Sequence, residues 1–227
     1  MARYKTVLLD ADGTLLDFEA TERQALRRTL ENRGLTLDEG RLATYLGINR
    51  PLWDAMHRGE VSQEALMVER FARFAKELGL EADAEAWNEE YLGYLGDCGD
   101  VIPGAVELLA ALKPHCTLVL ATNGQQDAQR RRLAGNPITP YLDHVFISQE
   151  MGVAKPDKEY FDHILQALQA DPATTVMVGD DLGSDIQGAI NAGIDSIWYS
   201  REKERNPLPT YQADSLAQVA AIILEER

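Results

Sequence analysis

The sequence contains few of the residues that mark a secreted or membrane-bound protein. Only 2 of its 227 residues are cysteines, Cys98 and Cys116. Two cysteines make no disulfide framework, so we interpret them as packing residues of a protein from a reducing compartment. No apolar run approaches the ~20 residues of a membrane-spanning helix. The N-terminus lacks a secretory pattern, because its apolar run 7–9 leads directly into Asp10. These absences predict a cytoplasmic protein without membrane contact.

Positive charge is also scarce. There are 22 Lys and Arg against 37 Asp and Glu, which gives a net charge of −15. Proteins that bind nucleic acids concentrate basic residues to neutralise phosphates, whereas the basic run Arg130-Arg131-Arg132 is interpreted here as a solvated helix face. We therefore expect no nucleic-acid polymer as a partner. A small anion remains compatible with the charge, because a local site can be positive on an acidic protein.

The composition is that of a globular chain, with 45% hydrophobic and 26% charged residues. Several short apolar runs end abruptly in polar residues. These runs cover 5–9, 117–121, 145–147, 175–178 and 194–199. Continuous runs of this kind are typical of strands buried on both faces of a parallel sheet. Helical patterns over 105–112, 158–169 and 184–192 alternate with them. The pattern predicts an α/β protein with a Rossmann-like parallel sheet.

The connection after the first strand is too long for an ordinary loop. Between residues 17 and 98 the sequence carries helical patterns over 21–32, 63–78 and 84–94, and no convincing buried strand. We therefore predict a helical domain, 17–98, inserted into a catalytic core formed by 1–16 and 99–227. The return to the core is expected at 97–103, which is rich in Gly and Asp.

The first cluster with chemical potential is Asp10-Ala11-Asp12-Gly13-Thr14, directly after the first strand. Two carboxylates two residues apart repel each other unless a cation or a substrate compensates their charge. A turn with a capping aspartate is the structural alternative. The buried strand before the cluster and the glycine within it favour a functional site, because sites in such sheets lie beyond the carboxyl ends of the strands.

A second acidic cluster, Gly179-Asp180-Asp181-Leu182-Gly183-Ser184-Asp185, follows another predicted strand. A carboxylate here can reach a cation held by Asp10. Carboxylate oxygens without His or Cys suit Mg²⁺. Mn²⁺ and Co²⁺ are alternatives at the same ligands. Asp185 can equally be an acid at a helix N-terminus, so it is expected to bind the metal either directly or through water.

Two further motifs follow predicted strands. The hydroxyl and backbone amides of Thr122-Asn123-Gly124 can cradle a phosphate, although Asn-Gly is also a plain turn signal. Lys155 precedes Pro156, which keeps it extended and can direct it inward, although a lone lysine is more often a surface residue.

In this order, the four motifs resemble those of the haloacid dehalogenase (HAD) superfamily of phosphohydrolases. The resemblance covers nearly the whole chain. It implies the HAD fold, with strand order 5-4-1-2-3, and a helical cap of the C1 type inserted after the first strand, as in the cap-bearing subfamily I.

The resemblance also implies roles for the motif residues. Asp10 would attack phosphorus to form an aspartyl-phosphate, and Asp12 would donate and then accept the proton. Thr122, Asn123, Gly124 and Lys155 would bind the phosphoryl oxygens. Mg²⁺ would be held by Asp10, the backbone carbonyl of Asp12, Asp180 and Asp185. Haloacid dehalogenases lack the second carboxylate of the first motif, so the presence of Asp12 argues against dehalogenation.

Residues 49–53, 147–156 and 176–185 resemble bacterial pyrimidine 5′-nucleotidases of the housecleaning type. This implies hydrolysis of nucleoside monophosphates such as dUMP, dTMP and UMP. Trp53 and Asn49 are then candidates for contact with the base, with packing inside the helical domain as the alternative for Trp53.

Two other functions stay open. One is a HAD phosphatase of sugar phosphates or phosphoglycolate, and the other is a non-catalytic binding protein on the same scaffold. The intact set of motif residues argues against the second. The partner is expected to be a small phosphorylated molecule, and the chain a monomer or a weak homo-oligomer.

Overall fold

The computed structural model describes residues 2–225. Contacts within the chain divide it into two compact units. We call residues 2–18 and 99–225 the core unit, and residues 19–98 the helical unit. The first boundary lies two residues beyond the predicted one, because Asp17 and Phe18 belong to the core unit.

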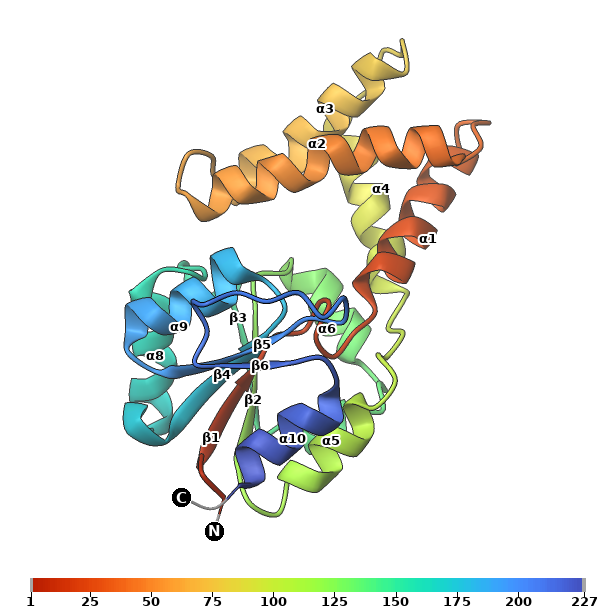
Figure 1. Cartoon of the computed structure of the whole chain (residues 1–227). Coiled ribbons are helices and arrows are strands. Elements are labelled where there is room, and N and C mark those ends of the chain that lie inside the picture. Colours follow the sequence, from red (N-terminus) through yellow and green to blue (C-terminus); the bar gives the residue numbers. More distant parts are fainter. Residues whose placement is uncertain (1, 226–227) are drawn as a thin grey trace. The chain divides into compact units, whose positions relative to one another are not determined.

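The core unit is built on a parallel sheet whose strands follow the order β3-β2-β1-β4-β5-β6 (Figure 1). The strands are β1 (Thr6–Leu9), β2 (Thr117–Thr122), β3 (His144–Ile147), β4 (Thr175–Gly179), β5 (Asp195–Tyr199) and β6 (Tyr211–Ala213). Leu9 in β1 lies opposite Leu120 in β2 and Val178 in β4. The loops that follow these three strands therefore leave the sheet at one edge. The predicted α/β class is confirmed, and β6 adds a strand that the sequence analysis does not predict.

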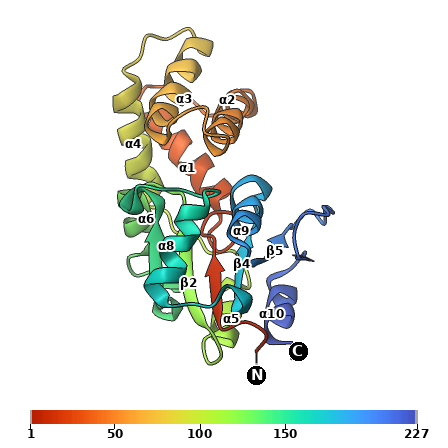
Figure 2. The ribbon, with the colours of Figure 1, turned by 90° about the vertical axis from the view of Figure 1, so that its left-hand side faces the viewer.

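Helices cover both faces of this sheet (Figures 1 and 2). One face carries α8 (Lys158–Leu168) and α9 (Gln187–Ala192), and the other carries α5 (Ala105–Leu112) and α10 (Leu216–Leu224). The remaining helices are α6 (Gln126–Leu133) and α7 (Ser148–Met151), with 3-10 turns at Thr139–Tyr141 and Pro172–Thr174 and a π-helical turn at Leu182–Ile186.

The central strand explains why its sequence is uninterruptedly apolar. Successive strand side chains point to opposite faces of a sheet. Val7 and Leu9 pack in the hydrophobic cluster with α5 and α10, whereas Leu8 packs in the cluster with α8 and α9. All three side chains are fully buried. A strand between two helical layers needs apolar residues at every position.

A short stem joins the two segments that connect the core unit to its insertion. The backbone N–H of Asp17 donates to the carbonyl of Asp100 at 2.8 Å, and that of Ile102 donates to Leu15 at 2.9 Å. Leu16 and Val101 form an antiparallel bridge between these bonds. The outgoing and returning segments therefore lie side by side.

The helical unit consists of α1 (Phe18–Glu31), which begins in the last residue of the core unit, α2 (Glu39–His57), α3 (Gln63–Glu77) and α4 (Ala84–Gly96). Asp38, Ser62 and Asp83 cap the N-termini of α2, α3 and α4 through their side chains. The core of this unit is aromatic, and the Tyr45 ring lies 5.5 Å from Phe74 and 5.8 Å from Phe71 between centroids. The predicted helical character of this region is confirmed.

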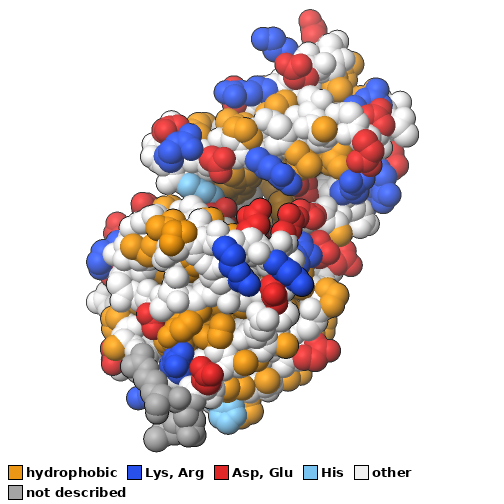
Figure 3. Space-filling view, viewed as in Figure 1, with side chains coloured by type: hydrophobic (Ala, Val, Ile, Leu, Met, Phe, Trp, Pro, Cys, Tyr) orange, Lys and Arg blue, Asp and Glu red, His pale blue; other side chains and the backbone are white. Residues whose placement is uncertain are grey.

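None of the helices in the described part of the chain combines the length and apolar character needed to cross a bilayer. On the face of the molecule drawn in Figure 3, Lys and Arg side chains are interspersed with Asp and Glu side chains.

Candidate active site

The first candidate residue, Asp10, follows β1 directly and is 7% exposed. Its backbone N–H continues the sheet by donating to the carbonyl of Val178 at 2.9 Å. The chain then turns at Gly13, which has a φ of +86°. A Cβ on Gly13 would lie 2.1 Å from Oδ2 of Asp180. Only glycine therefore allows this turn to approach Asp180, to whose Oδ1 the Thr14 hydroxyl donates at 3.3 Å.

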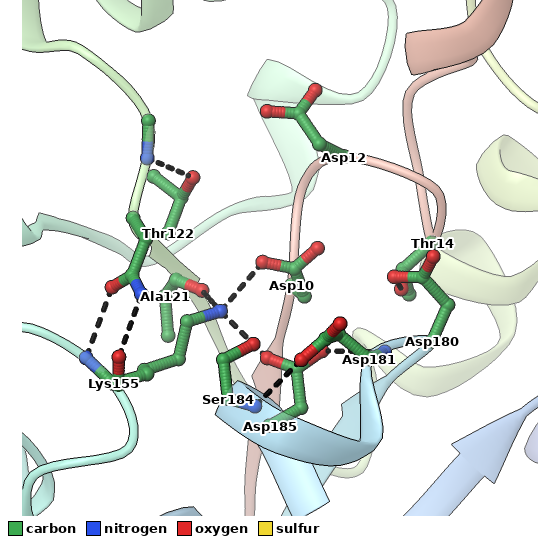
Figure 4. Close-up of polar contacts among 12 residues, drawn as sticks. Asp10, Asp12, Thr14, Ala121, Thr122, Lys155, Asp180, Asp181, Ser184 and Asp185 are labelled. Atoms are coloured by element: carbon green, nitrogen blue, oxygen red, sulfur yellow. Dashed lines mark hydrogen bonds and ion pairs between the residues drawn. The ribbon is translucent and has the colours of Figure 1, made fainter. Parts of the chain in front are cut away.

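Lys155 occupies the centre of the site (Figure 4). Its Nζ donates to Oδ1 of Asp10 at 2.6 Å, to Oδ1 of Asp185 at 2.7 Å and to the carbonyl of Ala121 at 2.8 Å. An ammonium group has three hydrogens to donate, so these bonds use its whole capacity. Lys155 is 2% exposed. The inward direction that the sequence predicts for it agrees with this geometry.

The backbone of Lys155 is held by the side chain of Asn123. The Asn123 Oδ1 accepts from the Lys155 N–H at 3.0 Å, and its Nδ2 donates to the Lys155 carbonyl at 2.8 Å. This pair of bonds joins the loop after β2 to the loop that carries the lysine. The Asn123 side chain therefore positions Lys155.

The loop after β4 carries the other two carboxylates. Asp185 is 1% exposed, and its Oδ2 accepts from the backbone N–H of Asp181 at 3.2 Å. A Cβ on Gly179 would lie 2.1 Å from the same oxygen, so glycine is required there too. The indole N–H of Trp198, in β5, donates to the backbone carbonyl of Asp180 at 2.7 Å.

Asp10, Asp180 and Asp185 form one acidic group. Each offers a carboxylate oxygen, and the three oxygens lie within 4.8 Å of one another. Lys155 offsets part of their charge through its ion pairs with Asp10 and Asp185. Carboxylate oxygens gathered in this way are ligands that suit Mg²⁺. The donor set therefore fits a divalent cation, which would balance the remaining negative charge.

The pKa values respond to this crowding. Burial raises the pKa of Asp10 to about 8, with the charges of Asp185 and Asp12 adding to the effect and Lys155 opposing it. Burial also raises the pKa of Asp180 and of Asp185. Burial alone would lower the pKa of Lys155, but the charges of Asp10 and Asp185 raise it above its usual range. A bound cation would favour the ionised carboxylates.

The carboxylate of Asp12 lies apart from the acidic group (Figure 4). Its Oδ1 accepts from Nη1 of Arg132 at 2.5 Å, and its Oδ2 accepts from Nε2 of Gln129 at 2.9 Å. A metal contact through its backbone carbonyl, as the family resemblance implies, stays a prediction.

Thr122 is the last residue of β2, and its hydroxyl is hydrogen-bonded to Gln129 of α6. Its Oγ1 accepts from the Gly124 N–H at 3.0 Å and from Nε2 of Gln129 at 2.8 Å. Thr122 is 1% exposed. The amide of Gly124, which the sequence analysis assigns to phosphate binding, is thus bonded to Thr122.

The interpretation of the basic run as a solvated helix face is wrong for Arg132. Arg130 is exposed and pairs with Glu150 at 2.7 Å, whereas Arg132 is 3% exposed and reaches Asp12. Gln129, which is 1% exposed, was not predicted as a site residue from the sequence. Residues 128, 129, 132 and 133 are buried and share one face of α6. That helical period was the available signal.

The other two candidates, Asn49 and Trp53, lie in the helical unit. Asn49 is 3% exposed, and its Nδ2 donates to Oε1 of Glu22 at 2.9 Å. Trp53 is half-buried and packs against a small hydrophobic cluster that contains Leu52 and Leu66. Within this unit, the Trp53 side chain is partly accessible, whereas the Asn49 side chain is almost fully buried.

The sequence matches the family of haloacid dehalogenase-like hydrolases over residues 4–193. The pyrimidine 5′-nucleotidase PynA of Streptococcus pneumoniae is 36% identical, over 93% of this chain and 92% of its own. The pyrimidine 5′-nucleotidase YjjG of Escherichia coli is 32% identical, over 97% of this chain and 98% of its own. A crystal structure of YfnB from Bacillus subtilis, described as a HAD-hydrolase bound to magnesium, has a TM-score of 0.93 at 34% identity, covering 97% of this chain and 99% of that one.

Proposed function

Because the chain belongs to the haloacid dehalogenase-like hydrolases, we propose that it is a Mg²⁺-dependent phosphatase of pyrimidine nucleoside 5′-monophosphates. The observation that carries the proposal is the acidic group of Asp10, Asp180 and Asp185 around the buried ammonium of Lys155. Carboxylates gathered beside a buried ammonium suit phosphoryl transfer, which depends on positioning and charge stabilisation.

Asp10 is the proposed nucleophile. A carboxylate oxygen of Asp10 forms a bond to phosphorus while the bond to the nucleoside 5′-oxygen breaks, which leaves an aspartyl-phosphate. Water then attacks phosphorus and releases inorganic phosphate and the free carboxylate. The short bond from Lys155 fixes the Asp10 carboxylate for the first displacement.

Asp12 is the proposed proton carrier. It gives a proton to the departing 5′-oxygen in the first displacement and takes one from water in the second. Its carboxylate is separate from the acidic group, which suits a residue whose task is proton transfer. The Asp12 carboxylate is held in place by one neutral donor, the Gln129 amide, and one cationic donor, the Arg132 guanidinium.

The phosphoryl oxygens are proposed to bind the Thr122 hydroxyl, the backbone amide of Asn123 and the ammonium of Lys155. Gly124 supports Thr122, since its amide already donates to that hydroxyl oxygen. Lys155 also compensates the charge of Asp10.

For the metal, we propose Asp10, Asp180 and the Asp12 carbonyl as protein ligands, with Asp185 acting directly or through water. When bound, Mg²⁺ would neutralise part of the charge on the carboxylates and on the phosphoryl group. The carboxylate set would accept Mn²⁺ or Co²⁺ as well. The likeness to a magnesium-bound structure at 34% identity supports this proposal.

The preference for pyrimidine nucleotides rests on the relatives. Two of them, at 36% and 32% identity over most of the chain, are named pyrimidine 5′-nucleotidases. We assign the helical unit to substrate selection as a cap, with Trp53 contacting the base and Asn49 positioning Glu22. We further propose a cytoplasmic enzyme without nucleic-acid polymers as partners, monomeric or weakly self-associating.

The test is phosphate release from dUMP, dTMP, UMP, AMP, glucose 6-phosphate and phosphoglycolate. Each assay is run with Mg²⁺, with EDTA, and with Asp10→Asn. We expect the fastest turnover with the pyrimidine nucleotides, dependence on Mg²⁺, and loss of turnover in the variant.

A preference for glucose 6-phosphate or phosphoglycolate would overturn the substrate assignment and leave the mechanism. No turnover with any of the six would favour the non-catalytic alternative. Turnover that persists in EDTA or in Asp10→Asn would overturn the mechanism.

A further inference from the structure

The geometry points to Gln129 as a positioning residue that presets two parts of the site at once, the Asp12 carboxylate and the Thr122 hydroxyl. This inference rests on the proposed function, because it concerns the orientation of the proposed proton carrier and of a proposed phosphate ligand. Gln129 belongs to α6, outside the four motifs, and is 1% exposed.

The orientation of the Gln129 amide follows from its neighbours. Its Oε1 accepts from Nη1 of Arg132 at 3.0 Å. A guanidinium can only donate, so the carbonyl end of the amide must face Arg132 and the NH₂ end must face away from it. That NH₂ group has two hydrogens, and they meet two acceptors, Oδ2 of Asp12 at 2.9 Å and Oγ1 of Thr122 at 2.8 Å.

This arrangement determines the direction of the Thr122 hydroxyl hydrogen. A threonine hydroxyl oxygen accepts two hydrogen bonds and donates one. The two acceptor positions of Thr122 are filled by Gln129 Nε2 and by the Gly124 N–H. The hydroxyl hydrogen is therefore left to donate, which is the role that a negatively charged phosphoryl oxygen requires.

The same amide fixes the Asp12 carboxylate. One carboxylate oxygen is bound by Arg132 and the other by Gln129, so rotation of the carboxylate about its χ2 angle is restrained from both sides. Arg132 has a fully buried side chain. A donor that is already oriented costs no reorganisation during the reaction.

Gly124 provides the space for this contact. A Cβ at position 124 would lie 2.4 Å from Nε2 of Gln129, 2.6 Å from Cγ and 2.7 Å from Cδ. Any larger residue would displace the Gln129 side chain. The close packing of Gln129 therefore explains why residue 124 is a glycine.

The first experiment replaces Gln129 by Met, which has nearly the same shape and cannot donate. The matched control is Gln166→Met, on the exposed surface of α8. For dUMP hydrolysis with saturating Mg²⁺, we expect kcat to fall ~10- to 100-fold in Gln129→Met, with KM rising by no more than several-fold. The control should match the wild type. Thermal unfolding of both variants checks that they are folded.

The second experiment separates the effect of Gln129 on Asp12 from its effect on Thr122. In an Asp12→Asn background, Gln129→Met should change kcat by a clearly smaller factor than in the wild type, because the proton carrier is already lost. Inhibition by inorganic phosphate should weaken several-fold in Gln129→Met in both backgrounds, because the Thr122 hydroxyl is no longer preset.

A third variant, Gly124→Ala, displaces the Gln129 side chain instead of replacing it. It should show the same loss of kcat and the same weaker inhibition by phosphate, so the inference stays testable if Gln129→Met fails to fold. Equal kcat losses in the two backgrounds, together with unchanged inhibition by phosphate, would overturn the inference and leave Gln129 a packing residue. An inactive wild type would instead defeat the proposed function. The phosphate-binding comparison, measured calorimetrically, would then still decide the Thr122 part.

Discussion

Both units of the chain bury a polar cluster, and the two clusters differ in charge balance. In the core unit, the carboxylates of Asp10, Asp180 and Asp185 lie close together, and the ammonium of Lys155 pairs with those of Asp10 and Asp185. In the helical unit, Glu22 is a single buried carboxylate, and the charges of two arginines, Arg70 and Arg50, oppose the rise in its pKa that burial causes. The core cluster therefore has excess negative charge, and the helical cluster does not.

Burial alone does not separate a reactive site from a structural one. Burial raises the pKa of Asp10 to about 8 and the pKa of Glu22 to about 7. The difference lies in the neighbours, because other carboxylates add to the shift at Asp10, whereas arginines and the Asn49 amide oppose it at Glu22. A cluster of carboxylates whose negative charge is not balanced by neighbouring basic residues is the better candidate for binding a cation.

The largest expected effect comes from Asp10→Asn compared with Glu22→Gln. Each substitution removes one buried carboxylate charge and keeps the side-chain shape. Asp10→Asn should lower kcat on the order of 10⁴-fold or more, because the nucleophile is lost. Glu22→Gln should change kcat by less than about tenfold. Steady-state kinetics of both variants with dUMP provide the measurement, and comparable losses would erase the contrast between the clusters.

The next effect concerns Lys155→Met. This change leaves Asp10 and Asp185 buried without their ammonium partner. Removing one partner of a buried ion pair destabilises a protein by about 3–5 kcal/mol. Urea unfolding at pH 8 should detect this loss. At pH 5 the loss should be smaller, because the raised pKa of each carboxyl group allows protonation. A loss independent of pH would contradict this account.

A matched pair of glycine substitutions comes third. Gly13 and Gly79 have positive φ angles of +86° and +69°, but only a Cβ on Gly13 would meet another group, Asp180. Both Gly→Ala variants should lose about 1–2 kcal/mol from the left-handed backbone alone. Gly13→Ala should in addition weaken Mg²⁺ binding, measured by calorimetry. Equal Mg²⁺ affinity in the two variants would show that Asp180 tolerates displacement.

The smallest effect is on the pH dependence of stability. Asp10 and Glu22 have raised pKa values in the folded protein, so the folded state binds more protons than the unfolded state between about pH 4 and pH 8. Their contribution to stability is complete at low pH and is lost as the pH rises through their folded pKa values. The Tm of metal-free protein should therefore fall from pH 5 to pH 8.

Two additions sharpen this measurement. Mg²⁺ should raise the Tm more at pH 8 than at pH 5, because it compensates the core cluster alone. Glu22→Gln should remove only the part of the pH dependence that Mg²⁺ does not affect. If Glu22→Gln also abolished the Mg²⁺ effect, the two clusters would be coupled.

Strands β1 to β5 could be predicted because each corresponds to a short apolar run that ends at a polar residue. The β6 strand was missed, since Tyr211–Ala213 contains no such run. The long helix α2 was not assigned either. It carries Pro51 in its interior, where proline removes a backbone donor and disrupts the usual helical pattern.

The candidate site also contains residues that could be predicted from the sequence and residues that could not. Asp10, Thr122 and Asp180 were predictable because each lies at the carboxyl end of a strand. Lys155 followed from its motif. The residues that hold these groups were not predictable by the same reasoning, because Gln129 and Trp198 act through contacts with distant parts of the chain. Arg132 was misassigned because two exposed arginines precede it.

The stem formed by Leu15–Asp17 and the returning segment 100–102 has a consequence for how this architecture can change. Because backbone bonds hold the two segments together, the intervening 19–98 begins and ends at neighbouring points of the chain. Closing a long loop between ends that are already adjacent costs the core little additional entropy. We therefore expect the helical unit to tolerate changes in length and sequence, because the stem and the sheet can keep their geometry when the insertion varies.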